Sequence, residues 1–270
     1  MPDGISAQRA RYLAGRRRAR LAVHGLRALL LLSFFAGWEL AARAGVIDPF
    51  IFSSPSRVMR TLMTMGVSGE LTVHLLASLA ETAAGFLLGT ALGTLIAVML
   101  WWSPFLARVL DPVLVVLNAL PKTALGPIFI VWMGAGPGAI ITMTLAISLI
   151  VTILDMHGGF TATDPEKVRL LRTLGATKGQ ILRKLVLPAN LAAMVGALKV
   201  NIGLSWVGVI MGEFLVSRAG LGYLIVYGSQ VFKMDLVMTT VVLLAAAAGL
   251  MYRLVLHLES FLKKTMGVTV

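Results

Sequence analysis

The chain has 270 residues, of which 58% are hydrophobic and 13% charged, and its mean hydropathy is +0.88. These values exclude a water-soluble domain of this length. The absence of cysteine excludes disulfides, Cys-ligated zinc, iron–sulfur clusters and thiol catalysis. A formal net charge of +12 is compatible with nucleic-acid binding. The basic residues lie where the loops of a membrane protein carry them, however, so we discount a nucleic-acid partner.

Six apolar segments have the length of roughly 20 residues that an α-helix needs to cross about 30 Å of hydrocarbon. We therefore predict an all-α membrane protein with six transmembrane helices and no soluble domain between them. The predicted spans are 26–45, 73–101, 112–133, 138–156, 188–212 and 236–258.

The basic residues orient this bundle in the membrane. With both termini in the cytoplasm, 17 of the 24 Lys and Arg residues lie inside and 5 outside, while Lys122 and Lys199 fall within spans. Cytoplasmic loops carry such an excess, so we expect a multi-pass protein with both ends inside. The expected organisation is a basic tail (1–25), the first span with an outer segment (26–72), a five-helix core (73–258) containing a cytoplasmic loop (about 157–187), and a second tail (259–270).

The first span also has features of a cleavable signal peptide, because arginines precede an apolar stretch that ends at Ala42-Arg43-Ala44. Glu39 and Arg43 lie close to that site, and the apolar run is longer than that of a usual signal segment. Both observations favour retention as a transmembrane helix.

The second span carries Gly85, Gly89 and Gly93 at four-residue intervals. This spacing puts all three on one helix face, where small residues let a neighbouring backbone approach closely. We predict a packing seam here rather than a chemical site.

The loop between the fourth and fifth spans is too polar to enter the membrane and is patterned as a helix–turn–helix. Asp164 and Pro165 suit the N-cap and the first helical position. Gly175 suits the left-handed conformation that ends helices, and Thr177 with Gln180 forms a capping-box pattern. Both helices carry apolar stripes that nothing else in the sequence visibly covers. We expect a partner protein to cover them.

The run Gly175-Ala176-Thr177, followed by Leu187-Pro188, resembles the coupling loop of binding-protein-dependent ABC importer permeases. Most of the chain is similar to the nitrate/sulfonate/taurine-type members. Their features are matched by Trp38-Glu39-Leu40, Ser54-Pro55-Ser56, the segment 121–127, Gly134-Ala135-Gly136, Gly212-Glu213 and Gly220-Leu221-Gly222.

This resemblance implies a permease subunit in the bacterial cytoplasmic (inner) membrane. The partners that it implies are a separate ATPase subunit, which holds ATP and Mg, an extracytoplasmic solute-binding protein and a second copy of the chain. The chain itself would hold no cofactor and have no catalytic residue, in agreement with the absence of a P-loop motif from the sequence. The resemblance also implies that the loop docks on the ATPase. The implied contact residues are Glu166, Val168, Arg169, Leu171, Leu174, Gly175, Ala176, Thr177, Ile181, Leu182 and Pro188.

The sequence departs from the family pattern at two positions. Arg169 stands where the coupling loop is expected to carry glutamate, and Glu166 lies three residues earlier. Either residue could take the role of that glutamate. Glu81 stands where sulfonate-type members tend to carry arginine. The substrate therefore stays open between a small anion and a vitamin precursor or aromatic carboxylate.

Two other classes of membrane protein are alternatives. A membrane-embedded metalloenzyme needs clustered ligands, whereas His24, His74, His157 and His257 are dispersed and none pairs at ligand spacing, so we predict no metal site. A secondary transporter usually carries two repeats of several spans, which six spans in one copy do not provide.

The predicted translocation pathway rests on polar residues within or beside the spans. Lys122 and Lys199 lie near the predicted midplane, where a lysine needs compensation. They either line a pathway for an anionic solute, or pair with Glu81 or snorkel. Glu213 is expected to belong to an external gate or to a plain interfacial loop. The candidate pathway residues are Asn118, Lys122, Lys199, Asn201, Ser205, Trp206 and Glu213.

Overall fold

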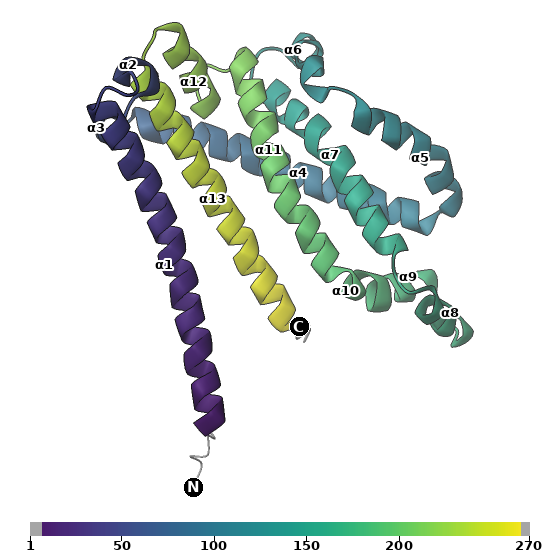
Figure 1. Cartoon of the computed structure of the whole chain (residues 1–270). Helices are drawn as coiled ribbons and strands as arrows, with labels where there is room; N and C mark the ends of the chain where they lie inside the picture. The colour runs from purple at the N-terminus through teal and green to yellow at the C-terminus, as the bar shows by residue number, and fades with distance from the viewer. Residues whose placement is uncertain (1–6, 266–270) are drawn as a thin grey trace.

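The computed structural model describes residues 7–265, and every regular element in that part of the chain is helical (Figure 1). The predicted all-α class is therefore confirmed. The outermost residues of the two expected tails, 1–6 and 266–270, lie outside the described residues. The α-helices are α1 (Ala7–Arg43), α2 (Pro49–Phe52), α3 (Pro55–Ser68), α4 (Glu70–Trp102), α5 (Pro104–Ala119), α6 (Gly126–Met133), α7 (Pro137–Thr161), α8 (Pro165–Thr173), α9 (Lys178–Ile181), α10 (Leu187–Ala189), α11 (Leu191–Val216), α12 (Leu221–Gln230) and α13 (Met234–Thr265).

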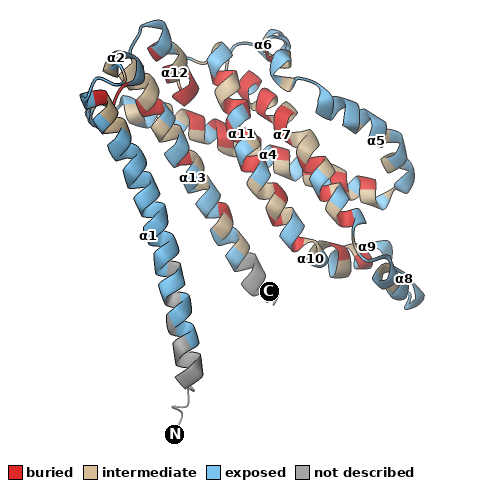
Figure 2. Ribbon diagram, in the orientation of Figure 1, coloured by how far each residue is buried: buried red, intermediate tan, exposed pale blue. Residues whose placement is uncertain are grey.

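The core of the protein is formed by α7, which packs against α4 on one side and α11 on the other. Figure 2 shows that the buried residues concentrate in these three helices. The three glycines of the predicted seam all lie at the contact of α4 with α7. The facing pairs are Gly85 with Thr144, Gly89 with Ser148, and Gly93 with Thr152. Because these three positions of α4 carry no side chain, the two helices approach each other closely.

The first helix, by contrast, lies at the periphery. It packs mainly against α2 and α3, and no residue in its apolar window is buried (Figure 2). Leu29, Leu30, Leu31 and Phe34 are each 60% exposed or more. Such an apolar surface is compatible with lipid, since lipid tails are as apolar as the side chains themselves.

The expected third span, 112–133, is not one continuous helix. Its first part belongs to α5, which begins before Pro112, and a 3₁₀ turn (Lys122–Leu125) connects α5 to α6 after a bend of 85°. Pro121 causes the break, because proline donates no backbone hydrogen bond and forces the preceding residue out of the helical region. Leu120 is extended accordingly, with ψ 138°.

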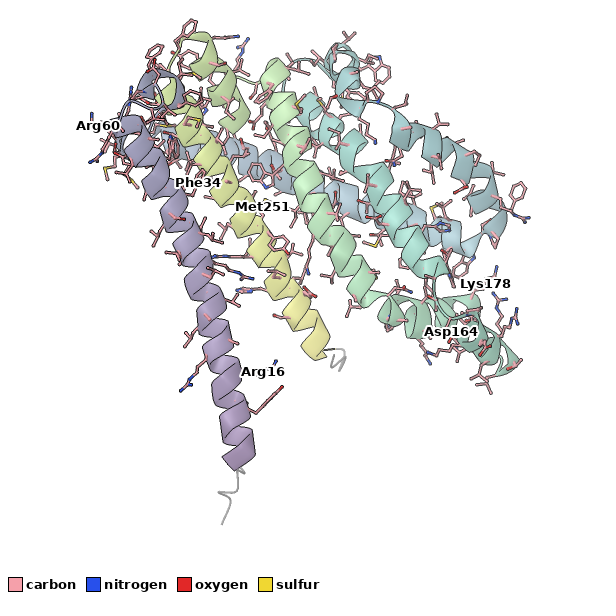
Figure 3. All side chains as sticks on the ribbon, viewed as in Figure 1. Arg16, Phe34, Arg60, Asp164, Lys178 and Met251 are labelled. Carbon is pink, nitrogen blue, oxygen red and sulfur yellow. The ribbon has the colours of Figure 1, made fainter. Side chains whose placement is uncertain are left out.

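Five described helices are long and apolar enough to cross a membrane, and the bent pair of α5 and α6 provides a sixth crossing if it counts as one span. The beginning of α1, the end of α13 and the α8–α9 segment lie toward one end of the bundle, whereas α2, α3, α6 and α12 lie toward the other (Figure 1). Figure 3 likewise places Asp164 and Lys178 at the end opposite Arg60. The five long helices and the bent pair follow the order of the predicted spans.

Candidate functional site

The predicted coupling loop, residues 157–187, folds as the local sequence signals indicate. Asp164 caps α8, since its Oδ1 accepts the Glu166 N–H at 2.9 Å. Gly175 has φ +80°, the left-handed conformation that lets the chain turn. The capping box at the start of α9 is also present, because Thr177 N–H donates to Gln180 Oε1 at 2.8 Å and Gln180 N–H donates to Thr177 Oγ1 at 3.3 Å.

A short π-helical segment (Leu182–Val186) follows α9 and leads into α10. Pro188 lies inside α10, where it is half-buried. The second helix of the loop therefore continues as far as Ala189. Asn190 follows it and is the N-cap of α11.

The expectation that no part of the chain covers the apolar stripes of this loop is wrong. Ile181 and Val186 are 1% and 0% exposed, and they form a buried cluster with Ala97 of α4 and Met156 and Phe160 of α7. The half-buried side chains of the loop pack on the same cluster, namely those of Val168, Leu171, Ala176, Leu182, Leu185 and Leu187. The ends of α4 and α7, distant in sequence from α9, supply this cover.

The surface that the loop leaves open is smaller than the sequence predicted. Leu174, which belongs to the stripe expected to be covered by a partner, is 73% exposed, and its neighbour Leu170 is 59% exposed. Glu166, Arg169 and Gly175 are exposed as well. We call these five residues the exposed tip of the loop, and a partner can reach it together with the other exposed residues of α8 and α9.

At the opposite end of the bundle, Glu213 is only 1% exposed. Its carboxylate accepts the Ser78 hydroxyl at 2.5 Å and the Gly222 N–H at 2.5 Å, and the Ser78 Oγ in turn accepts the Leu221 N–H at 2.7 Å. We call Ser78, Glu213, Leu221 and Gly222 the Glu213 clamp. It ties the beginning of α12 to α4 and α11, so Glu213 is not the solvated carboxylate of a plain interfacial loop.

The glycine before the clamp makes this close approach possible. Gly220 has φ +117°, and a Cβ atom there would collide with the Glu213 carboxyl group. Its N–H donates to His74 Nδ1 at 3.1 Å. Only glycine combines this backbone conformation with this lack of space.

The two lysines of the predicted pathway have separate environments. Lys199 Nζ lies 2.7 Å from Glu259 Oε2 at the end of α13. Lys122 Nζ donates to the backbone and side-chain oxygens of Asn118, at 2.9 and 3.3 Å. The alternative in which a lysine pairs with Glu81 is wrong, because the partners of the two lysines are Glu259 and Asn118, and Glu81 lies beside Glu213.

The remaining pathway candidates are buried on α11 rather than exposed to an open channel. Asn201, Ser205 and Trp206 are at most 4% exposed, and Asn201 Nδ2 donates to Thr90 Oγ1 of α4 at 2.7 Å. Trp206 packs in a cluster with Leu221 of α12 and residues of α13. Asn201 and Trp206 therefore contact neighbouring helices of the same chain, while Ser205 is buried on α11.

Sequence reasoning missed the role of Ser78 as a bridge in the clamp and that of Glu259 as the partner of Lys199. Ser78 lies at the entry of the second span, where a lone hydroxyl carries little signal. Glu259 lies far along the chain from Lys199, in the segment expected to be a tail. No local spacing could have joined either pair.

Comparison with known proteins identifies the family of this architecture. The model of the family described as "Binding-protein-dependent transport system inner membrane component" matches residues 89–264, which include the predicted coupling loop and the Glu213 clamp apart from Ser78. The chain is 28% identical over 236 residues to a Bacillus subtilis protein named for aliphatic sulfonates transport, with 87% of this chain and 86% of that protein covered.

Two further relatives are named for different solutes. The formylaminopyrimidine transport permease protein of Halalkalibacterium halodurans is 29% identical over 195 residues, covering 72% of this chain and 77% of the relative. The taurine transport system permease protein of Escherichia coli is 22% identical over 219 residues, covering 79% and 80%. Among solved structures, the inward-facing MetNI methionine ABC transporter has a similar fold, with a TM-score of 0.61 at 20% identity over 72% of this chain and 94% of that chain.

Proposed function

The chain belongs to the family of binding-protein-dependent transport system inner membrane components, and from this premise we propose that its α8–α9 loop couples a separate ATPase to the spans. It is the permease subunit of an ABC importer, a transport component rather than an enzyme. ATP and Mg are bound and used on the ATPase subunit. The solute arrives from an extracytoplasmic binding protein and passes into the cytoplasm across the bacterial inner membrane.

The observation that carries this proposal is the division of the loop into an anchored side and an exposed tip. Ile181 and Val186 fix the loop to the ends of α4 and α7, whereas Leu170, Leu174 and Gly175 are exposed beyond it. A loop that transmits movement from a partner needs an exposed surface for the partner and a fixed contact with the spans. The tip contacts the ATPase, and the anchored side passes the movement to the spans.

A homodimer completes the proposed assembly. In the described chain, α5 has no buried residue, and Val113, Val115 and Val116 are 47% exposed or more. A second copy would cover part of this apolar surface. The translocation pathway would then lie between the copies, with Lys122 near it, since a lysine at membrane depth is placed at lower cost beside a water-filled path than against lipid.

The substrate that we propose is a small organic anion of the sulfonate type. Two of the relatives above are named for sulfonates and taurine, and Lys122 forms no ion pair within residues 7–265. A pyrimidine precursor is the second candidate, because another relative is named for formylaminopyrimidine transport. ATPase activity of the reconstituted complex with its binding protein distinguishes these classes, since only the correct solute stimulates it.

The coupling role is tested with a pair of matched glycine variants. Gly175 and Gly69 both have φ +80° and have open space where a Cβ atom would lie, but they are at opposite ends of the bundle. A β-branched residue at either position has a steric cost of roughly 1–2 kcal/mol. We expect Gly175→Val to abolish solute-stimulated ATPase activity in the purified complex, while Gly69→Val lowers stability equally but leaves activity. Equal activity of the two variants would refute the coupling role.

A further inference from the structure

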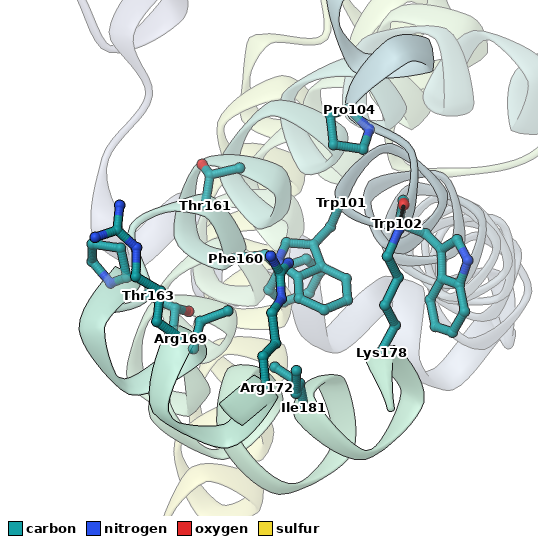
Figure 4. A pocket seen from close by; sticks show the side chains of 12 residues that line it. Trp101, Trp102, Pro104, Phe160, Thr161, Thr163, Arg169, Arg172, Lys178 and Ile181 are labelled. Carbon is teal, nitrogen blue, oxygen red and sulfur yellow. Dashed lines mark hydrogen bonds between the residues drawn. The ribbon is translucent and has the colours of Figure 1, made fainter. Parts of the chain in front are cut away.

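A cavity of about 350 Å³ lies between the coupling loop and the ends of α4 and α7, and we call it the loop cavity (Figure 4). Trp101, Trp102 and Phe160 line it from the spans. On the other side it is lined by α8 and by both ends of the short helix α9, which contributes Lys178 and Ile181. Of the exposed tip of the loop, Arg169 belongs to this lining, whereas Leu170 and Leu174 do not.

The charged residues of the loop cavity are all basic. Arg169, Arg172 and Lys178 line it, and no acidic residue does. None of the three forms an ion pair with a described residue. Lys178 Nζ donates one hydrogen bond to the Trp102 carbonyl oxygen at 3.4 Å, which leaves its other protons for a ligand. Three positive charges around one cavity attract an anion.

Neutral donors add to this basic lining. Thr163 lies on the cavity wall, and its Oγ1 accepts a hydrogen bond from Asn190 Nδ2 at 2.7 Å. Its own hydroxyl proton remains for an acceptor. The cavity thus offers guanidinium, ammonium and hydroxyl donors, the combination that oxygen-rich anions such as phosphate accept.

The place of the cavity in the fold indicates where the anion comes from. Trp102 ends α4 and Thr161 ends α7, and both helices are apolar enough to span a membrane. Lipid phosphates lie in the layer where such spans end, and tryptophan prefers the same layer. Figure 4 shows the side chains of Arg172 and Lys178 extending from the loop toward Trp101 and Trp102, and so toward the span ends.

We propose that the loop cavity binds the phosphate group of an anionic phospholipid of the cytoplasmic leaflet. Arg172 and Lys178 hold the phosphate, while Trp101 and Trp102 contact the glycerol and the upper acyl chains. An acidic side chain of the ATPase fits less well, because these cations extend toward the membrane and away from the exposed tip. The bound lipid would connect the loop to the ends of two spans. This inference goes beyond the proposed function and is tested without ATP or solute.

The test compares two double variants that remove the same charges. Arg172→Gln/Lys178→Gln removes one arginine and one lysine from the cavity, and Arg183→Gln/Lys184→Gln removes the same pair from exposed positions outside it. The full chain is reconstituted in nanodiscs with equal amounts of phosphatidylglycerol and phosphatidylcholine. Native mass spectrometry then measures the ratio of the two lipids retained by each protein.

We expect the wild-type chain to retain phosphatidylglycerol preferentially. A basic residue near an anionic surface contributes about five-fold in affinity, so loss of the two residues that hold the phosphate should cost roughly 20-fold of this preference. The control pair lies outside the cavity and should lose clearly less. Arg172→Lys keeps the charge and should keep most of the preference, which separates charge loss from misfolding. An equal loss in both double variants would show that only general surface charge acts, and would overturn the proposal.

Two further arms distinguish other sources of the anion. Inorganic phosphate at millimolar concentration should not displace the lipid, and displacement would mean that the cavity takes a free anion instead. Addition of the ATPase subunit should leave the lipid in place. If one equivalent of the ATPase subunit released the lipid, the cavity would be part of the docking surface for that subunit, and the proposed lipid site would be wrong.

Discussion

Lys199 Nζ and Glu259 Oε2 lie 2.7 Å apart, joining the first half of α11 to the far end of α13. This ion pair is partly exposed, with side-chain exposures of 27% and 17%. A lysine in a membrane helix is commonly either part of a pathway or part of a structural pair. The contact with Glu259 assigns Lys199 to the second group.

The ion pair predicts how charge removal affects folding. Lys199→Met leaves the Glu259 carboxylate without this partner, so it should lower the melting temperature and the dimer yield. Adding Glu259→Gln should restore part of the loss, as a coupled pair requires. Lys122→Met removes a lysine that has no ion pair among the described residues and should lower uptake at normal yield. Lost uptake with full yield in Lys199→Met would instead favour a pathway role.

The Glu213 clamp predicts a loss of stability on removal of one hydroxyl. Ser78→Ala leaves the Leu221 N–H without its acceptor and removes one donor from the Glu213 carboxylate. An unsatisfied buried group costs about 1–3 kcal/mol, so thermal unfolding should begin at a lower temperature and transport should fall. Ser229→Ala is the control, because Ser229 is exposed and donates only to the backbone of its own helix. Equal melting temperatures for the two variants would contradict the clamp.

The contact of α11 with α7 predicts an effect of a single methyl group. A Cβ atom at Gly208 would lie 2.5 Å from Thr144 Cα, whereas one at Gly203, on the same helix, would meet nothing within 4 Å. Gly208→Ala must push two backbones apart, and overpacking of this kind costs about 1–3 kcal/mol or more. Gly203→Ala should be neutral or slightly stabilising, as alanine favours helix. Detergent-solubilised yield and melting temperature check both variants.

Because the chain has no cysteine, the orientation of the bundle can be measured with single introduced thiols. Leu174 and Val67 are 73% and 92% exposed. Leu174 is the C-cap of α8 and Val67 lies in α3, and these two helices lie toward opposite ends of the molecule (Figure 1). In intact cells, an impermeant thiol reagent should label Val67→Cys and leave Leu174→Cys unlabelled until the membrane is opened. The reverse pattern would invert the predicted topology.

The parts of the structure that the sequence predicted best depend on neighbouring residues. The caps at Asp164 and Thr177 and the turn at Gly175 are formed by contacts within a few residues, so their spacing alone indicates them. The glycine seam of α4 could also be predicted from the sequence, because the helical period determines which residues share a face.

What the sequence could not predict depends on tertiary contacts. Nothing in the sequence indicates that the chain itself covers the apolar stripe of the coupling loop. In the structure, Phe160 and Ala97 cover Ile181 from two other helices. Pro121 is a local signal for a break, but the segments on both sides of it are apolar. Hydropathy therefore predicted one continuous span where the structure has two helices bent by 85°. Lys199 and Glu81 were opposite charges available for pairing, and only the packing of α13 against α11 shows that Glu259 is the partner of Lys199.

The cluster of Ala97, Phe160 and Ile181 has a mechanical consequence. Ile181 and Phe160 are essentially inaccessible and pack in one cluster with Ala97, so this side of the loop is in direct contact with α4 and α7. In the coupling role proposed above, a displacement of the loop would therefore reach two helices from different parts of the chain through one contact. A displacement at Leu174 would then move the ends of α4 and α7 together, because the glycine seam holds these two helices in close contact.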